Sequence, residues 1–351
     1  MVLTRTPAPA RPRPAAGVAA TQAHRGLGLL VCVAVLAFVC LLSIAVGTRT
    51  VSPHTVWDAF FHYTDTDDQS VVRDLRLPRT VVGLLAGVAF GLSGAVIQAV
   101  TRNPLADTQI LGVNSGAGLF VVFAVGVLGR TDLSQYMWFG FAGVAFALTL
   151  VYLLGSAGRA GATPVRLTLA GVALGAVMDG ISGGIRLVRP RAFDYLRFWD
   201  IGSLAGRPVD VATTILPFVL AGTVLALIVA RSLNAVALGD DLARTLGAGI
   251  GRTRVLATVS VMLLAGAATA AVGPIGFVGL MVPHIVRWIV GPDQRWIFLY
   301  TVVLGPVLLL LADIVGRLVV RPGELRVGVV TAFVGAPVLI WWVRRRRVSG
   351  L

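Results

Sequence analysis

The sequence predicts an all-α integral membrane protein with about ten transmembrane helices. Hydrophobic residues make up 56% of the 351 residues and charged residues only 13%, and the mean hydropathy is +0.86. The apolar residues gather in runs of about 20, the length that crosses the hydrocarbon core of a bilayer. A soluble fold has too little interior to bury this much apolar surface, whereas lipid can surround it.

The chain starts with residues 1–25, which are rich in Pro, Ala and Arg and are predicted to form a disordered cytoplasmic tail. The apolar run at residues 26–47 is longer than the hydrophobic region of a cleavable signal peptide, so it is interpreted as an uncleaved first span. Cys32 and Cys40 both fall in this run. A continuous helix would separate them by about 12 Å along its axis, too far for a disulfide.

Nine further apolar runs have the length of a span. They are residues 80–100, 109–129, 135–156, 165–186, 210–230, 255–273, 275–291, 296–316 and 328–343. The boundary at Gly273 and Pro274 is weak because two runs adjoin there, so nine or eleven spans also fit the pattern. Residues 26–347 are expected to form a single transmembrane domain, with residues 348–351 as a cytoplasmic tail.

All 30 basic residues are arginine, and the net charge is +14. An even number of spans places both termini on the same side of the membrane, and the arginine clusters at both ends predict that this side is the cytoplasm by the positive-inside rule. The other arginines are scattered between apolar runs, which argues against nucleic-acid binding despite a pI near 11.4. A chain without lysine has no P-loop, so ATP hydrolysis of that type belongs to another chain.

Glycine accounts for 41 residues and recurs at helical spacing at Gly83, Gly87, Gly91 and Gly94. Small residues on one face let transmembrane helices approach closely. The pattern therefore predicts a tightly packed helix bundle, not a catalytic glycine loop.

Residues 231–254 form a polar break between two apolar runs. Within the break, Leu238, Leu242 and Leu246 recur every four residues and form one helical stripe. Acidic residues at the start of this segment and Arg244 further along suit the helix macrodipole. The segment predicts a short amphipathic helix that fits a groove on a soluble partner, with an ordinary solvated loop as the alternative.

Polar residues inside the spans have two interpretations each. Gln98, Asn114 and Ser115 either line a pathway or make hydrogen bonds between helices. Asp179 and Asp313 either relay protons or pair structurally.

No catalytic set and no metal site are predicted, because the four histidines lack the paired spacing of metal ligands. Packing or capping is expected for His284. A solvated acidic loop is expected around His54 and His62, with a weak metal contact as the alternative.

Four segments occur in order along residues 27–347. Residues 75–118 contain LRLPR, GLSG, NPLA and LGVNSGAG; residues 238–247 read LGDDLARTLG; residues 273–287 contain GPIGFVGL and VPH; and residues 312–338 contain ADIVGR, GVVT and GAPV. Together these motifs resemble the FecCD-type permeases of ABC importers, the family of iron-siderophore, haem and vitamin B12 permeases.

The resemblance implies the architecture of a type II ABC importer permease in the bacterial cytoplasmic (inner) membrane. A second permease subunit, in a homodimer or a heterodimer, would complete the translocation pathway at the interface. Two cytoplasmic ABC ATPase subunits would hold ATP and Mg²⁺, and a periplasmic or lipid-anchored binding protein would deliver the cargo. A ferric siderophore is the expected cargo, with haem or cobalamin as alternatives. The chain itself would be no enzyme, would bind no cofactor and would contact membrane lipids but no nucleic acid.

The resemblance also assigns residues. It places residues 231–254 against the ATPase, through Leu238, Gly239, Asp240, Asp241, Leu242, Arg244, Leu246 and Gly247. It places Arg76, Arg79 and Arg317 on the outer rim, where arginine forks pair with glutamates of the binding protein; rim packing or lipid contact is the alternative. The competing function is a self-contained proton-coupled transporter with Asp179 and Asp313 as relay, which would not need residues 238–247.

Overall fold

The computed structural model describes residues 22–157 and 163–345, and its regular elements are helices, with no strand in these ranges. Most of the predicted N-terminal tail and all of the C-terminal tail lie outside the described residues. The longer helices are α1 (Gln22–Ala45), α4 (Leu77–Thr101), α5 (Val113–Gly126), α6 (Leu133–Ser156), α7 (Pro164–Val188), α9 (Val209–Val236), α11 (Ile250–Val272), α12 (Val278–Val290), α13 (Gln294–Val319) and α14 (Val327–Arg345). The short ones are α2 (Pro53–Phe61), α3 (Asp67–Ser70), η1 (Val71–Arg76), η2 (Thr108–Leu111), α8 (Pro190–Trp199) and α10 (Asp240–Thr245).

Every predicted span coincides with one of the longer helices. Seven helical segments are long and apolar enough to cross a membrane, and one of them joins α3, η1 and α4 into a continuous helix of 35 residues. The other three spans correspond to α5, α12 and α14, which are apolar but shorter. The all-helical membrane fold is therefore confirmed, while the count of ten crossings stays a prediction.

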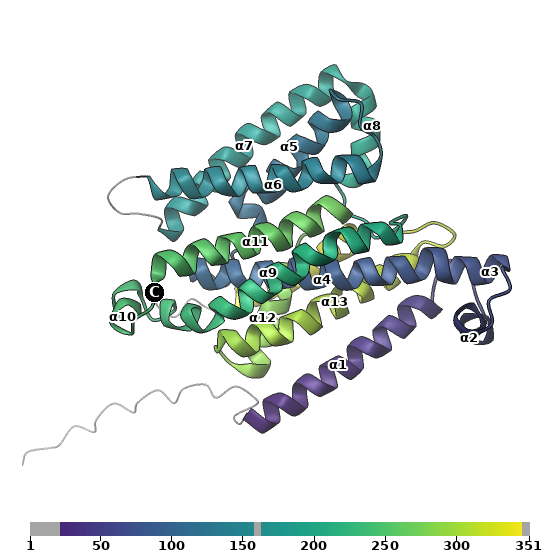
Figure 1. Ribbon diagram of the computed structural model, residues 1–351, viewed down its shortest axis with the longest axis horizontal. Coiled ribbons are helices and arrows are strands. Elements are labelled where there is room, and N and C mark those ends of the chain that lie inside the picture. Colours follow the sequence, from purple (N-terminus) through teal and green to yellow (C-terminus); the bar gives the residue numbers. More distant parts are fainter. Residues whose placement is uncertain (1–21, 158–162, 346–351) are drawn as a thin grey trace, which may run out of the picture.

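The helices form two groups that lie side by side (Figure 1). Helices α5, α6, α7 and α8 make one group, and α9, α11, α12 and α13 surround α4 in the other. In the most apolar stretch of the continuous helix that contains α4, 78% of the residues are buried, whereas in that of α1, at the edge of the bundle, only 11% are. Helix α4 is thus the hub of the fold, and α1 meets mainly lipid in a membrane.

Glycines on α4 allow the close packing that their spacing predicts. A Cβ atom at Gly87 would overlap the backbone of Pro306 on α13, and one at Gly94 would overlap the backbone of Gly279 on α12. Larger residues would push these helices apart, so the small side chains set the helix spacing.

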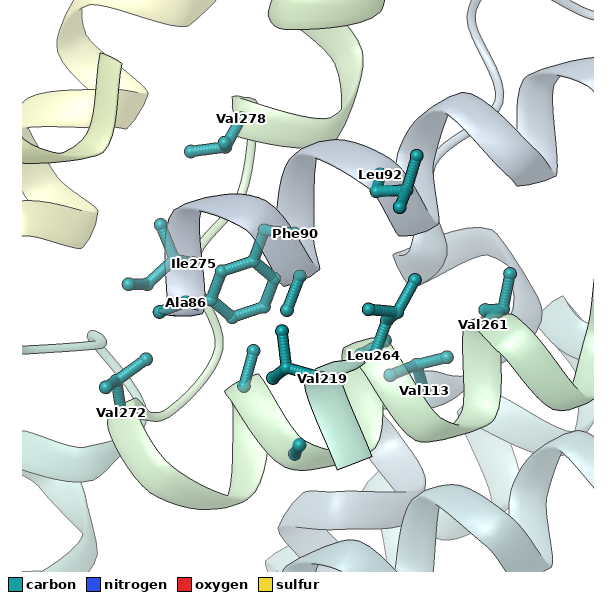
Figure 2. Packing of buried hydrophobic residues seen from close by; sticks show 14 of the residues in the cluster. Ala86, Phe90, Leu92, Val113, Val219, Val261, Leu264, Val272, Ile275 and Val278 are labelled. Atoms are coloured by element: carbon teal, nitrogen blue, oxygen red, sulfur yellow. The ribbon is translucent and has the colours of Figure 1, made fainter. Parts of the chain in front are cut away.

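The core lies where α4, α9 and α11 meet (Figure 2). Phe90 of α4 packs there with Val219 of α9 and Leu264 of α11, and all three side chains are buried. Ile275, between α11 and α12, and Val278, the first residue of α12, reach the same cluster.

A break in helical structure separates α11 from α12 at residues 273–277. Gly273 has a φ of +79° and Phe277 a φ of +71°, so the backbone turns sharply at both ends. Gly279 at the start of α12 packs on Gly94, which lies well inside α4. The break therefore lies at membrane depth, where irregular backbone is tolerated only inside protein or beside an aqueous cavity.

The two ends of the bundle collect different elements. Helix α10 and the start of α1 lie at one end, and α2, α3 and α8 lie toward the other (Figure 1). Tyr300 Oη donates to the carbonyl of Arg25 at 2.6 Å, which fixes the start of α1 beside the start of α13. The end that carries α10 is called the inner end below and the opposite one the outer end; their placement relative to the cytoplasm stays a prediction.

Candidate functional site

A large cavity opens between α5, α7, α8, α14 and the break at residues 273–277. Its volume is about 880 Å³, within the range of sites that hold small molecules. The lining includes apolar groups such as Phe277 and Phe333 and polar groups such as Gln109 and Asp179. We call it the central cavity.

Two of the three predicted pathway residues line the central cavity. Asn114 and Ser115 lie there, and Ser115 Oγ donates to Oδ2 of Asp179 at 3.0 Å. Gln98 does not: it is buried in the packed bundle, where its Nε2 donates to the carbonyl of Gly279 at 3.0 Å. Its Oε1 accepts a hydrogen bond from Nη2 of Arg287 at 2.6 Å. Gln98 therefore connects α4 to α12, and pathway lining stays a prediction for Asn114 and Ser115.

An ion pair that the sequence did not reveal spans the outer part of this cavity. Nη1 of Arg186, near the end of α7, lies 2.5 Å from Oδ2 of Asp200, which follows α8. Both residues line the central cavity. The pair holds α8 against α7 and adds one positive and one negative charge to the wall.

The segment expected to contact an ATPase forms a short helix at the inner end. Gly239, before α10, has a φ of +109°, and Gly247, after it, a φ of +78°, values that glycine adopts without strain. Leu238, Leu242 and Leu246 are exposed. A helix of six residues is thus present, with Leu242 inside it and Leu238 and Leu246 on either side of it; the three exposed leucines suit a docking surface, and the docking itself stays a prediction.

Asp240 connects this helix to the membrane bundle. Its carboxylate pairs with Arg102 at the end of α4 and, at 2.9 Å, with Nη2 of Arg254 in the first turns of α11. Burial and the charge of Arg254 lower the pKa of the Arg102 guanidinium, which shows how closely the two cations lie. Asp241 faces solvent instead and pairs with Arg244 at 3.0 Å. Of the two predicted aspartates, one points to the bundle and one to the outside.

Arg76 and Arg317 lie toward the outer end, as the resemblance implies, but their side chains are buried. Their exposed fractions are 4% and 2%. Arg76 Nη1 donates to the carbonyl of Ala45 at 2.7 Å, and Arg317 Nη1 donates to that of Val46 at 2.7 Å. Helix α1 has no basic residue in its last turn, so these arginines from η1 and α13 satisfy its terminal carbonyls. Their role in binding-protein docking stays an untested prediction, and their burial disfavours it.

Arg79 belongs to an ion-pair network at the outer end. Its Nε and Nη2 hold Asp313 at 2.9 and 2.8 Å, and its Nη1 holds Glu324 at 2.8 Å. Arg317 pairs with the same Asp313 at 3.2 Å. Asp313 therefore has the structural pairing that the sequence left open, and this network joins α4, α13 and the segment before α14.

The described residues contain no group of three or more His, Cys, Asp or Glu side chains suited to a metal ion. His54 and His62 both lie against Asp58, at 2.8 and 3.6 Å.

Residues 35–345 match the FecCD transport family. The chain belongs to this family. It is 46% identical over 333 residues to the ferric enterobactin transport system permease protein FepD of Escherichia coli (strain K12), covering 95% of this chain and 98% of FepD. It is 40% identical over 324 residues to the iron(3+)-hydroxamate import system permease protein FhuB of Bacillus subtilis (strain 168), covering 91% of this chain and 84% of FhuB.

A solved structure also resembles this FecCD-family chain. It is a metal-chelate type ABC transporter in an inward-facing conformation, with a TM-score of 0.81 and 25% identity over 91% of this chain and 99% of the other. Family membership and the apolar helices together make the chain a multi-pass inner-membrane protein and a transport component.

Proposed function

We propose that this chain is the permease subunit of an ATP-driven importer that carries a ferric siderophore. The observation that supports this most strongly is the central cavity at one side of a bundle whose inner end carries α10 with its exposed leucines. One element is suited to hold cargo and the other to receive force from a soluble partner. Relatives named for ferric enterobactin and iron(3+)-hydroxamate favour an iron chelate as cargo, with haem and cobalamin as alternatives.

A second permease subunit would close the central cavity. Helix α7 is only 22% buried within its most apolar window, and its Asp179 is exposed on the cavity wall. A carboxylate at membrane depth needs water or a protein partner, because lipid cannot solvate it. A second copy, or a similar chain, opposite α7 and α14 would supply both and would enclose the pathway.

Two ABC ATPases would dock, one on α10 of each permease subunit, with ATP and Mg²⁺ bound to the ATPases and not to this chain. The three exposed leucines suit an apolar groove, and Asp240 would transmit the motion of α10 to α4 and α11 through its two arginines. A binding protein would deliver the chelate to the outer end. A proton-coupled mechanism gains no support, because Asp313 is already paired with two guanidiniums.

The test co-expresses the chain with the ATPase encoded beside it and reconstitutes the complex in nanodiscs. The exchange Asp241→Arg with Arg244→Glu reverses the exposed pair on α10 and should abolish transport-linked ATP hydrolysis. The matched control, Asp68→Arg with Arg49→Glu, reverses an exposed pair at the outer end and should leave ATPase association unchanged. If no ATPase associates with the wild type and a proton gradient alone moves substrate, the proposal is wrong.

A further inference from the structure

A second, smaller cavity lies at the outer end of the bundle. Its volume is about 380 Å³, and its walls include Arg79, Tyr136, Trp199, Arg207, Glu324 and Arg326. These residues come from the first turns of α4 and α6, the end of α8, and the segments before α9 and α14. We call it the outer arginine pocket. Trp199 also lines the central cavity, so the two cavities share a wall.

The pocket carries more positive charge than its own carboxylate balances. Glu324 is already held by Arg79 at 2.8 Å. Arg207 makes one side-chain hydrogen bond, from Nε to the carbonyl of Ser203 at 3.3 Å, and no ion pair within the described part of the chain. Burial and the charges of Arg207 and Arg197 lower the pKa of Arg326, which reflects crowding of cations here. Like charges in a half-buried recess favour an anionic occupant.

A buried donor without a partner lies in the same wall. Trp199 is 4% exposed, and its indole Nε1 has no hydrogen-bond partner among the described residues. An indole N–H can only donate, and so can a guanidinium. Unpaired buried donors are uncommon in folded proteins and call for an explanation such as a ligand. The guanidinium donors of Arg207 and Arg326, which line the pocket, match a ligand rich in anionic oxygen atoms.

We propose that the outer arginine pocket binds the anionic oxygen atoms of the iron chelate before the chelate passes Trp199 into the central cavity. This inference rests on the proposed function and deepens it, because it names the cargo class. Iron(III) bound by three catecholates carries a triple negative charge, whereas iron(III) bound by three hydroxamates is neutral. Guanidinium forks recognise paired anionic oxygens and gain nothing from a neutral shell. The pocket therefore selects an anionic catecholate-type or carboxylate-type chelate.

The experiment measures chelate binding to the permease–ATPase complex in nanodiscs of uncharged lipid, without binding protein. The probes are a hexadentate iron(III) tricatecholate and a hexadentate iron(III) trihydroxamate, both labelled with radioactive iron and followed by equilibrium dialysis. The wild type should bind the tricatecholate at least about tenfold more tightly, because charge-assisted hydrogen bonds are the strong ones. Equal affinity for the two probes overturns the proposal.

Variants assign the effect to the pocket. Arg207→Ala and Arg326→Ala should each weaken tricatecholate binding about tenfold, and Arg207→Lys should fall between Arg207→Ala and the wild type. Arg130→Ala removes an exposed arginine between α5 and α6 that does not line the pocket, and it should change nothing. Each variant is first checked for ATPase association and an unchanged unfolding midpoint. If Arg207→Ala and Arg130→Ala behave alike, the pocket is not the site.

A carboxylate of the binding protein is the other source of anionic oxygens. If Arg207→Ala weakens binding-protein association and leaves tricatecholate affinity unchanged, the proposal is overturned. ATP-driven uptake by the wild type, measured separately with the binding protein present, tests the importer itself. Uptake that persists without any preference for the charged chelate would retain the importer and refute only this pocket.

Discussion

Replacing Asp240 by Asn should uncouple ATP hydrolysis from transport while the ATPase still binds. The change removes the carboxylate that joins α10 to Arg102 on α4 and to Arg254 on α11. The exposed leucines of α10, on which docking is proposed to depend, are not altered. Motion of α10 would then reach the bundle less faithfully, because a neutral amide attracts the two guanidiniums far less than a carboxylate does.

The magnitude follows from the exposure of the three side chains. Asp240 is 29% exposed, Arg102 is 33% exposed and Arg254 is 14% exposed, so solvent screens both pairs in part. Each such pair contributes up to about 1 kcal/mol, and losing both costs about 1–2 kcal/mol. That loss increases the population of molecules in which α10 is detached from α4 and α11 by a factor of about 5–30.

The assay is the amount of chelate imported per ATP hydrolysed in proteoliposomes. We expect a several-fold fall in this ratio for Asp240→Asn and an unchanged amount of co-purified ATPase. The control is Asp194→Asn, whose side chain is 66% exposed and pairs with Arg197 on α8, away from the inner end; it should leave the ratio unchanged. The exchange Asp240→Arg with Arg254→Asp should restore part of the ratio. A normal ratio together with weaker ATPase association would refute the reasoning, since Asp240 would then contact the ATPase and not the bundle.

Three further outcomes concern stability, each measured by thermal unfolding in detergent. Arg317→Met breaks a buried ion pair and uncaps α1, so it should lower the free energy of unfolding by about 3–5 kcal/mol. The control Arg73→Met changes an exposed arginine that stacks on Tyr63 and should lower it by less than about 1 kcal/mol. Equal losses for the two variants would contradict the capping role. Gly87→Leu should cost about 3 kcal/mol because its side chain meets the backbone of Pro306, and Gly26→Leu, which faces open space, should be neutral. Burial raises the pKa of Asp107, so the folded state favours the protonated carboxyl group. The stability gained from this protonation is complete below the unfolded-state pKa of about 3.9 and is lost as the pH rises through the folded-state pKa. Asp107→Asn should therefore raise the unfolding midpoint at neutral pH, with the gain vanishing below about pH 4; a gain that stays constant with pH would exclude this explanation.

The sequence predicts the helices well because hydrophobic length is a local property. The run at residues 135–156 becomes α6 at Leu133–Ser156, and the stripe of Leu238, Leu242 and Leu246 becomes the exposed face around α10. The predicted span boundary near Gly273 is ambiguous for a structural reason, because residues 273–277 form the non-helical break between α11 and α12. Patterns of apolar residues therefore predict the helices and their order along the chain.

Residue roles at the outer end depend on contacts that the local pattern cannot show. Arg76 lies before a predicted span, as a rim arginine would, yet its partners are carbonyls of α1 that lie about 30 residues earlier in the chain. Arg186 and Asp200 meet only because α8 folds back beside α7. Gln98 is different, because a signal was present: it lies four residues after Gly94, on the face of α4 that packs against α12. Helical spacing would have favoured its role in helix contact.

The capping of α1 from distant helices constrains how the protein is made. Helix α1 leaves the ribosome first, but Arg317, which binds the carbonyls of Ser43 and Val46, follows Ser43 by 274 residues. Until α13 has entered the membrane, α1 lacks this cap and its main packing partner, and only η1, α2 and α4, with the cap from Arg76, hold its outer end. A nascent chain that stops before α13 therefore displays a loosely attached first helix. Release of α1 to proteases would then distinguish an unfinished permease from a complete one.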